Sequence, residues 1–190
     1  MCGRYQAWIE DDELMYIIER EKKGSLMQYF RQNEVFPGTT MPLLYGSYAA
    51  VRAHLSKWGF EIKSGTKSQL LINARSETVE EKPMFRIPFE NERAVIPVSA
   101  YYEWSNGVKY RIFSDGGEPL LLGCVEKTDQ AGVRRHVILT SEARGIPARI
   151  HDRMPLFIPR RDLESWLYET DYARRRVREE IELPIRAEAV

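Results

Sequence analysis

The sequence predicts an α+β fold: a single, mainly β domain with curved, barrel-like antiparallel sheets and helices at its periphery. Three observations predict it. The length of 190 residues is typical of one domain, and we expect residues 1–190 to form that domain. Short apolar or alternating runs, separated by turn residues, fill much of the chain after Arg93. Helical spacing of apolar residues is confined to two segments outside those runs.

The first third of the chain is expected to pass from helix to strand. In residues 11–31, apolar side chains recur at three- and four-residue spacing, which predicts helix with an interruption at Gly24 and Ser25. A turn centred on Pro37-Gly38 is expected over residues 34–39. Two short strands, 42–45 and 49–55, are expected to follow it.

The central part is predicted to be a series of strands. They are 94–98, 101–104, 109–113, 120–125 and 136–140. The segments between them, 105–107, 115–117 and 129–132, contain the Asn-Gly, Asp-Gly and Gly residues that favour hairpin turns.

The last part is predicted to be helical and charged. Residues 160–168 are expected to form a helix that buries Leu163, Trp166 and Leu167. The run Arg174-Arg175-Arg176 before Glu179-Glu180 is typical of a solvated helix face rather than a binding patch.

Composition limits the classes of function. The 28 Lys and Arg residues balance the 28 Asp and Glu residues, which excludes binding to nucleic acid through a bulk positive field but allows a local basic groove. No apolar run approaches the roughly 20 residues of a membrane span, and no signal pattern is seen, so we expect a cytoplasmic protein without membrane contact. Cys2 and Cys124 form no Cys-x-x-Cys pair, which argues against a disulfide framework and a thiolate zinc site; neither metal nor cofactor is expected.

Cys2 is the first candidate for chemistry. Removal of Met1 would expose a residue with two nucleophiles, an α-amine with a pKa near 8 and a thiol with a pKa near 8.5. The amine can condense with an aldehyde, and the thiol can close on the imine carbon to give a thiazolidine ring. The alternative is that Cys2 is simply a small buried residue.

Three further stretches place polar residues among apolar ones. Asn73, Arg75 and Glu77 are expected on one face of an extended segment. Glu103 lies among aromatic residues, where burial would raise its pKa toward that of a general acid. His151 precedes Arg153 at the start of a strand-like run that continues to residue 158.

Each of these residues also has a structural interpretation. Asn73 could make the hydrogen bonds of a turn, Glu103 could pair with an arginine, and His151 could be an inert core residue. His54 and His136 are interpreted as structural, and Trp58-Gly59 as core followed by a turn.

Together, the motifs resemble those of a known family. Met1–Tyr5, Trp58-Gly59, 73–77, 102–104 and 150–155 occur in the order found in the SOS-response-associated (SRAP) family of abasic-site proteins. The resemblance implies a mainly β fold whose positively charged cleft takes single-stranded DNA containing abasic sites. It also implies a covalent thiazolidine link through the processed N-terminal cysteine, with reversal, lyase activity and self-processing of Met1 as related activities.

Roles follow from the matched motifs. The resemblance assigns the amine and thiol to Cys2, orientation of the cysteine and the sugar to Asn73, proton transfer to Glu103, and closure and reversal to His151. It places Arg4, Arg75 and Arg153, with Glu77 in the same motif, beside the DNA backbone. Residues 59–69 lack the tryptophan pair that some relatives use beside the lesion, and the chain ends soon after Pro184 without the longer members' Asn-containing motif.

Two other classes of function remain open. An N-terminal-nucleophile amidohydrolase, similar to a class II glutamine amidotransferase, also begins with Cys-Gly after loss of methionine. A passive single-stranded DNA binder could use cation–π and stacking contacts without chemistry. We expect the protein to be a monomer.

Overall fold

The computed structural model describes residues 2–7, 10–20, 26–31, 34–48, 50–64, 67–181 and 183–190. The chain begins with β1 (Tyr5–Gln6), α1 (Asp12–Glu19) and a 3₁₀ helix (Leu26–Arg31). Asp11 caps α1, because its side chain accepts a hydrogen bond from the Leu14 amide at 2.9 Å. The two helical pieces confirm helix within residues 11–31, whereas the interruption expected at Gly24-Ser25 lies outside the described residues.

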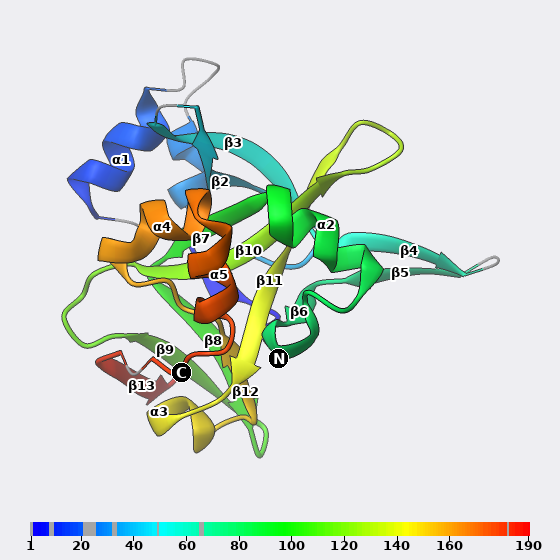
Figure 1. Cartoon of the computed structure of the whole chain (residues 1–190). Coiled ribbons are helices and arrows are strands. Elements are labelled where there is room, and N and C mark those ends of the chain that lie inside the picture. The colour runs from blue at the N-terminus through cyan, green and yellow to red at the C-terminus, as the bar shows by residue number, and fades with distance from the viewer. Residues whose placement is uncertain are drawn as a thin grey trace.

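The larger sheet closes on itself. Its strands are β2 (Thr40–Ser47), β3 (Ala50–Trp58), β6 (Asn73–Arg75), β7 (Arg93–Val98), β10 (Leu120–Thr128), β11 (Arg134–Glu142) and β12 (Arg153–Pro155). The order is β10-β7-β2-β3-β11-β12, with β6 beside β11, and a further β10–β11 pairing closes the path into a ring (Figure 1). Most of these pairings are antiparallel, but β6 and β3 run parallel to β11.

A second sheet lies below the ring in the view of Figure 1. It has the order β1-β8-β9-β13, with β8 (Ala100–Ser105), β9 (Val108–Ser114) and β13 (Ile185–Ala189). Asn106 and Gly107 make the β8–β9 turn with φ values of 51° and 80°, the left-handed pair that a type I′ hairpin requires. The hairpin predicted at residues 105–107 is therefore confirmed.

A two-stranded ribbon projects from the body of the molecule (Figure 1). Its strands are β4 (Phe60–Ser64) and β5 (Lys67–Leu71). The chain turns into it at Gly59, where φ is +112° and an added Cβ would lie only 2.5 Å from Leu70 Cγ, so a larger residue would be strained. Trp58 is fully buried and donates from Nε1 to the Ile72 carbonyl at 3.0 Å, so core followed by a turn is confirmed for Trp58-Gly59.

Further helices pack around the two sheets. They are α2 (Pro83–Asn91), α3 (Gly145–Ala148), α4 (Leu163–Tyr168) and α5 (Thr170–Arg176), with 3₁₀ turns at Ser76–Thr78 and Arg160–Asp162. Helix α4 packs on β2 and β7, and α2 packs on β10. Leu163, Trp166 and Leu167 are buried as predicted. The mainly β, α+β fold with peripheral helices is confirmed.

Three local expectations are wrong. Glu77 lies in the 3₁₀ turn after β6 rather than on an extended segment, so it does not share a strand face with Asn73. Arg176 is buried and donates to the Phe157 carbonyl at 2.6 and 3.1 Å, so the arginine run is not entirely a solvated face. The strand expected to continue to residue 158 ends at Pro155.

The interpretation of His54 and His136 as structural agrees with their surroundings. His54 pairs with the buried Glu126 at 2.7 Å. His136 is fully buried, and its Nδ1 lies 3.1 Å from the Ser56 hydroxyl.

Candidate functional site

The site begins where β6 meets the first residues of the chain. Strand β6 pairs with β11, which holds Asn73 opposite Ile138. The Asn73 side chain, on a residue only 7% exposed, donates from Nδ2 to the Cys2 carbonyl at 3.0 Å. Its Oδ1 is buried without a hydrogen-bond partner among the described residues. Because burying such an acceptor is costly, we interpret Oδ1 as available to a ligand.

Cys2 is completely buried at this point. Its Sγ makes a weak contact with the Arg4 carbonyl at 3.9 Å. Burial, and next the negative charge of Glu103, raise the pKa of the Cys2 thiol well above its ordinary value. The sulfur is therefore a protonated thiol at neutral pH, and nucleophilic use of it requires a base or an activated partner.

Glu103 reaches the site from β8. Its neighbours Tyr102 and Trp104 point to the opposite face of the strand, whereas Glu103 shares the buried face with Tyr101. Burial raises the pKa of Glu103. A carboxyl group with a raised pKa can hold a proton nearer neutral pH and donate it, as a general acid must.

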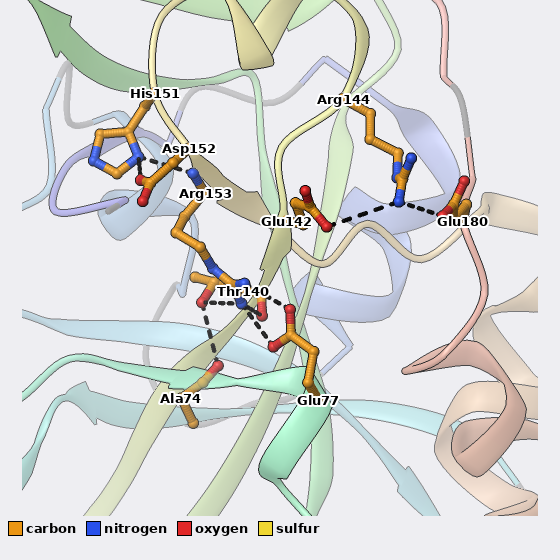
Figure 2. A network of polar contacts seen from close by, with 9 residues as sticks. All are labelled: Ala74, Glu77, Thr140, Glu142, Arg144, His151, Asp152, Arg153 and Glu180. Carbon is orange, nitrogen blue, oxygen red and sulfur yellow. Dashed lines mark hydrogen bonds and ion pairs between the residues drawn. The ribbon is translucent and has the colours of Figure 1, made fainter.

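His151 lies in the loop between α3 and β12 and is close enough to Glu103 for its charge to lower the pKa of that carboxyl. The Arg153 amide donates to His151 Nδ1 at 2.9 Å (Figure 2). In the neutral ring the proton is then on Nε2. Protonation of Nδ1 would replace this contact with one to the Asp152 carboxylate, which lies 2.7 Å away.

Arg153 and Glu77 are joined to each other. The guanidinium makes two contacts with the Glu77 carboxylate, at 2.6 and 2.8 Å, and a third with the Thr140 carbonyl at 2.5 Å (Figure 2). The hydrogen bonds from Arg153 lower the pKa of Glu77. Arg75, in contrast, is exposed at the end of β6. The structure thus groups Cys2 and Asn73 with Glu103 and His151, and places the Glu77–Arg153 pair beside His151.

Arg4 lies on a different surface. In the register of the four-stranded sheet, Tyr5 and Tyr101 face the core, so Arg4 projects from the other side. We call this side the outer face; it also carries Tyr102, Trp104, Lys109 and Arg111.

The outer face combines cations with aromatic rings. The Arg4 guanidinium lies 4.2 Å from the ring centroid of Phe36 and 5.0 Å from that of Trp104. The Lys109 ammonium lies 4.1 Å from the Tyr102 ring centroid. Phe36 and Trp104 remain 47% and 40% exposed. Phe36 and Lys109 were not identified from the sequence as members of this face. A partial signal was present, because the alternation Tyr102-Glu103-Trp104 places two aromatic rings on the strand face opposite the buried carboxyl.

Two further properties concern the described part of the chain. It contains no group of three or more His, Cys, Asp or Glu side chains arranged to hold a metal ion. None of its helices has the length and apolar character needed to cross a membrane.

Comparison with known proteins identifies relatives over most of the chain. The abasic site processing protein YoqW of Bacillus subtilis is 27% identical over 182 residues, which covers 88% of this chain and 80% of the relative. The abasic site processing protein YedK of Escherichia coli is 30% identical over 182 residues, covering 88% of this chain and 79% of the relative. A crystal structure of a protein from Bordetella bronchiseptica matches the fold with a TM-score of 0.74 at 22% identity, covering 100% of this chain and 99% of that one.

The family assignment rests on the whole chain. The family model described as SOS response associated peptidase (SRAP) matches residues 1–189, which include Cys2, Asn73, Glu103 and His151. The chain belongs to the SRAP family.

Proposed function

We propose that this protein captures abasic sites in single-stranded DNA as a covalent thiazolidine formed by Cys2. The names of its relatives, abasic site processing proteins, support the substrate. The observation that carries the proposal is the contact of Asn73 Nδ2 with the Cys2 carbonyl, made across the fold by residues 71 positions apart. The contact holds Cys2 in the region of Glu103 and His151, which supports the part proposed for these two residues in the reaction.

The proposed reaction begins with removal of Met1, which frees the α-amine of Cys2. The amine nitrogen adds to C1′ of the ring-opened sugar, and loss of water leaves an imine. The Cys2 sulfur then bonds to the imine carbon while the thiol proton passes to the nitrogen, which closes the five-membered ring. The imine also acidifies the neighbouring C2′ proton, so β-elimination with strand cleavage is a competing path.

The surrounding side chains have defined tasks in this scheme. Glu103, whose pKa is raised by burial, gives a proton to the departing water. Asn73 holds the backbone of Cys2 and offers its unpartnered Oδ1 to a sugar hydroxyl. His151 carries its neutral-state proton on Nε2 and assists ring closure and reversal.

The DNA backbone would follow cationic residues at the site and on the outer face. Arg75 is exposed and suited to a phosphate, and Arg4 offers a cation between the two exposed rings of Phe36 and Trp104. Base stacking on aromatic side chains does not depend on sequence, as capture of a lesion in any context requires. These two rings offer the stacking that the tryptophan pair supplies in some relatives.

The test uses an oligonucleotide with one abasic site. Purified protein whose mass shows loss of Met1 should form an adduct that survives heat and denaturant, whereas an intact oligonucleotide should give none. A Cys2→Ser variant keeps the amine but replaces the thiol with a poorer nucleophile. It should form only an imine, so its adduct should appear after borohydride reduction and be lost without it. A full yield of heat-stable adduct from Cys2→Ser without borohydride would contradict the thiazolidine.

A further inference from the structure

The outer face holds a carboxylate between its two cations. Glu34 Oε2 accepts from Arg4 Nη1 at 3.1 Å, and Oε1 of the same side chain contacts Lys109 Nζ. The neighbouring Val35 bridges to Tyr5, which fixes the segment beside β1. The hydrogen bond from Lys109, with the charge of Arg4, lowers the pKa of Glu34, so the carboxylate is ionised at neutral pH.

This arrangement matches the contacts that a phosphate group makes. A phosphate presents two anionic oxygens, and arginine and lysine are its usual partners in proteins. Here the two oxygens of Glu34 are shared between one arginine and one lysine. The exposed rings of Phe36 and Trp104 flank Arg4, where bases on either side of such a phosphate could stack.

We propose that Glu34 occupies the position of a DNA phosphate on Arg4 and Lys109, and that a bound strand must displace it. The inference rests on the proposed function for the identity of the strand and adds a residue that limits affinity for intact DNA. Displacement is feasible because the Glu34 side chain is 27% exposed, and ion pairs of that exposure contribute little to stability. The carboxylate can turn into water while a phosphate takes over both cations.

The consequence for the protein is selectivity without tight binding. A chain with zero net charge draws its affinity for nucleic acid from local cations, and Glu34 neutralises two of those on the outer face. Intact strands would therefore dissociate readily. An abasic strand would be retained by the covalent bond, so discrimination comes from chemistry rather than from contacts that every strand can make.

The experiment measures binding of an intact single-stranded oligonucleotide by fluorescence anisotropy over a range of NaCl concentrations. Glu34→Gln should bind about tenfold more tightly at low salt, because two cations become available for charge-assisted contacts. The plot of log K against log salt should keep a similar slope, because a bound strand makes the same phosphate contacts in both proteins once Glu34 has turned into water. Glu34→Asp keeps the charge on a shorter side chain and should fall between the wild type and Glu34→Gln.

Glu80 provides a matched control. It also bridges two arginines, Arg174 and Arg178, and its side chain is 26% exposed against 27% for Glu34. Glu80→Gln removes the same charge and frees two cations, but at α5 and away from the outer face. It should leave the affinity and the salt slope unchanged.

The outcomes separate this inference from the proposed function. Equal gains for Glu34→Gln and Glu80→Gln would show an effect of bulk charge and overturn the inference, as would unchanged or weaker binding by Glu34→Gln. Absence of binding to intact DNA by every variant would also overturn it. A wild-type protein that traps no abasic DNA rejects the proposed function, whereas tighter binding by Glu34→Gln, with no gain for Glu80→Gln, still supports the role of Glu34.

Discussion

At the scale of single residues, the site raises the pKa of a thiol and the pKa of a carboxyl, in the direction that their proposed tasks require. Cys2 and Glu103 are both buried, and for each of them burial is the largest cause of a raised pKa. A protonated thiol avoids premature oxidation or alkylation, because the thiolate is the reactive form. A protonated carboxyl can supply the acid that imine formation needs. Both pKa shifts depend on the exclusion of water from around these two side chains.

Glu103→Gln tests the carboxyl. The substitution should slow adduct formation with abasic DNA on the order of 100-fold, since it removes proton transfer, while affinity for intact DNA should remain unchanged. Rate and affinity are measured separately, by quenched time courses and by anisotropy. Equal losses in both would indicate that Glu103 only supports the structure.

The same variant has an expected signature in stability. A carboxyl whose pKa is raised by folding is protonated in both states below the unfolded pKa of about 4.3, and stability is lost as pH rises through the folded value. Glutamine stays neutral throughout. The free energy of unfolding of Glu103→Gln, measured in urea, should therefore exceed that of the wild type by a margin that grows with pH.

At the scale of elements, the Glu77–Arg153 pair joins two short pieces of chain that carry site residues. Glu77 belongs to the 3₁₀ turn that follows β6 and Asn73, and Arg153 opens β12 two residues after His151. Because Arg153 also donates its amide to His151, the orientation of the histidine depends on a pair made across the two elements. This pairing is a structural role for both residues; contact of either with DNA stays a prediction.

Glu77→Gln should destabilise the protein by about 1 kcal/mol at neutral pH, a modest value because the Glu77 side chain is 46% exposed. The pKa of Glu77 is lowered by folding, so its contribution is present above the unfolded value of about 4.3 and is lost as pH falls through the folded one. Urea unfolding at neutral and acidic pH should show the difference between wild type and variant shrinking on acidification. A difference that stays constant with pH would assign it to packing rather than charge.

The elements also show what the sequence could predict. Alternating apolar residues, with Asn-Gly or other Gly-containing turns between the runs, correctly predicted β7 through β11. The prediction works there because the apolar positions of the sequence pattern are the positions that the fold buries. Helix α2 was not predicted, since Pro83 and Pro88 obscure its apolar spacing, and β13 was missed because its residues are mostly exposed. The prediction for Glu77 failed because β6 ends before it. The 3₁₀ turn that contains Glu77 has no clear sequence signal.

Prediction of the site was similarly uneven. Cys2, Asn73, Glu103 and His151 could be identified from the sequence, by their reactive or polar side chains and by the family motifs. The structure brings them into one region. The place of Arg4 on the outer face, and its contact with Glu34, depend on strand register and on a bridge between distant segments. Neither can be derived from local pattern, because each requires knowledge of which strands pair.

At the scale of the whole molecule, the ring of strands encloses buried polar groups as well as an apolar core. Burial, with the charge of His54, lowers the pKa of His136 from 6.5 to about 3. The histidine is therefore neutral in the folded protein throughout the physiological range. Unfolding exposes it to water, where it regains its ordinary affinity for protons.

His136 should make the fold sensitive to acid. Between about pH 6.5 and the folded pKa of about 3, the unfolded state binds one proton more than the folded state. Stability should fall by up to about 1.4 kcal/mol for each pH unit of acidification in that window. His136→Asn keeps a polar atom toward Ser56 but does not titrate. The free energy of unfolding of this variant, measured in urea, should therefore vary with pH by the equivalent of about one proton less than that of the wild type. Identical pH slopes for the two proteins would contradict a lowered pKa for His136.

The four-stranded sheet ends on β13, which is an edge strand. Unpaired backbone groups on such an edge can recruit a strand from another molecule and start aggregation. On β13 the side chains of Arg186 and Glu188 are exposed and charged, and they alternate with the half-buried Ile185 and Ala187. Charge at these positions discourages lateral association, so their replacement by apolar residues would lower the concentration at which the protein stays dispersed.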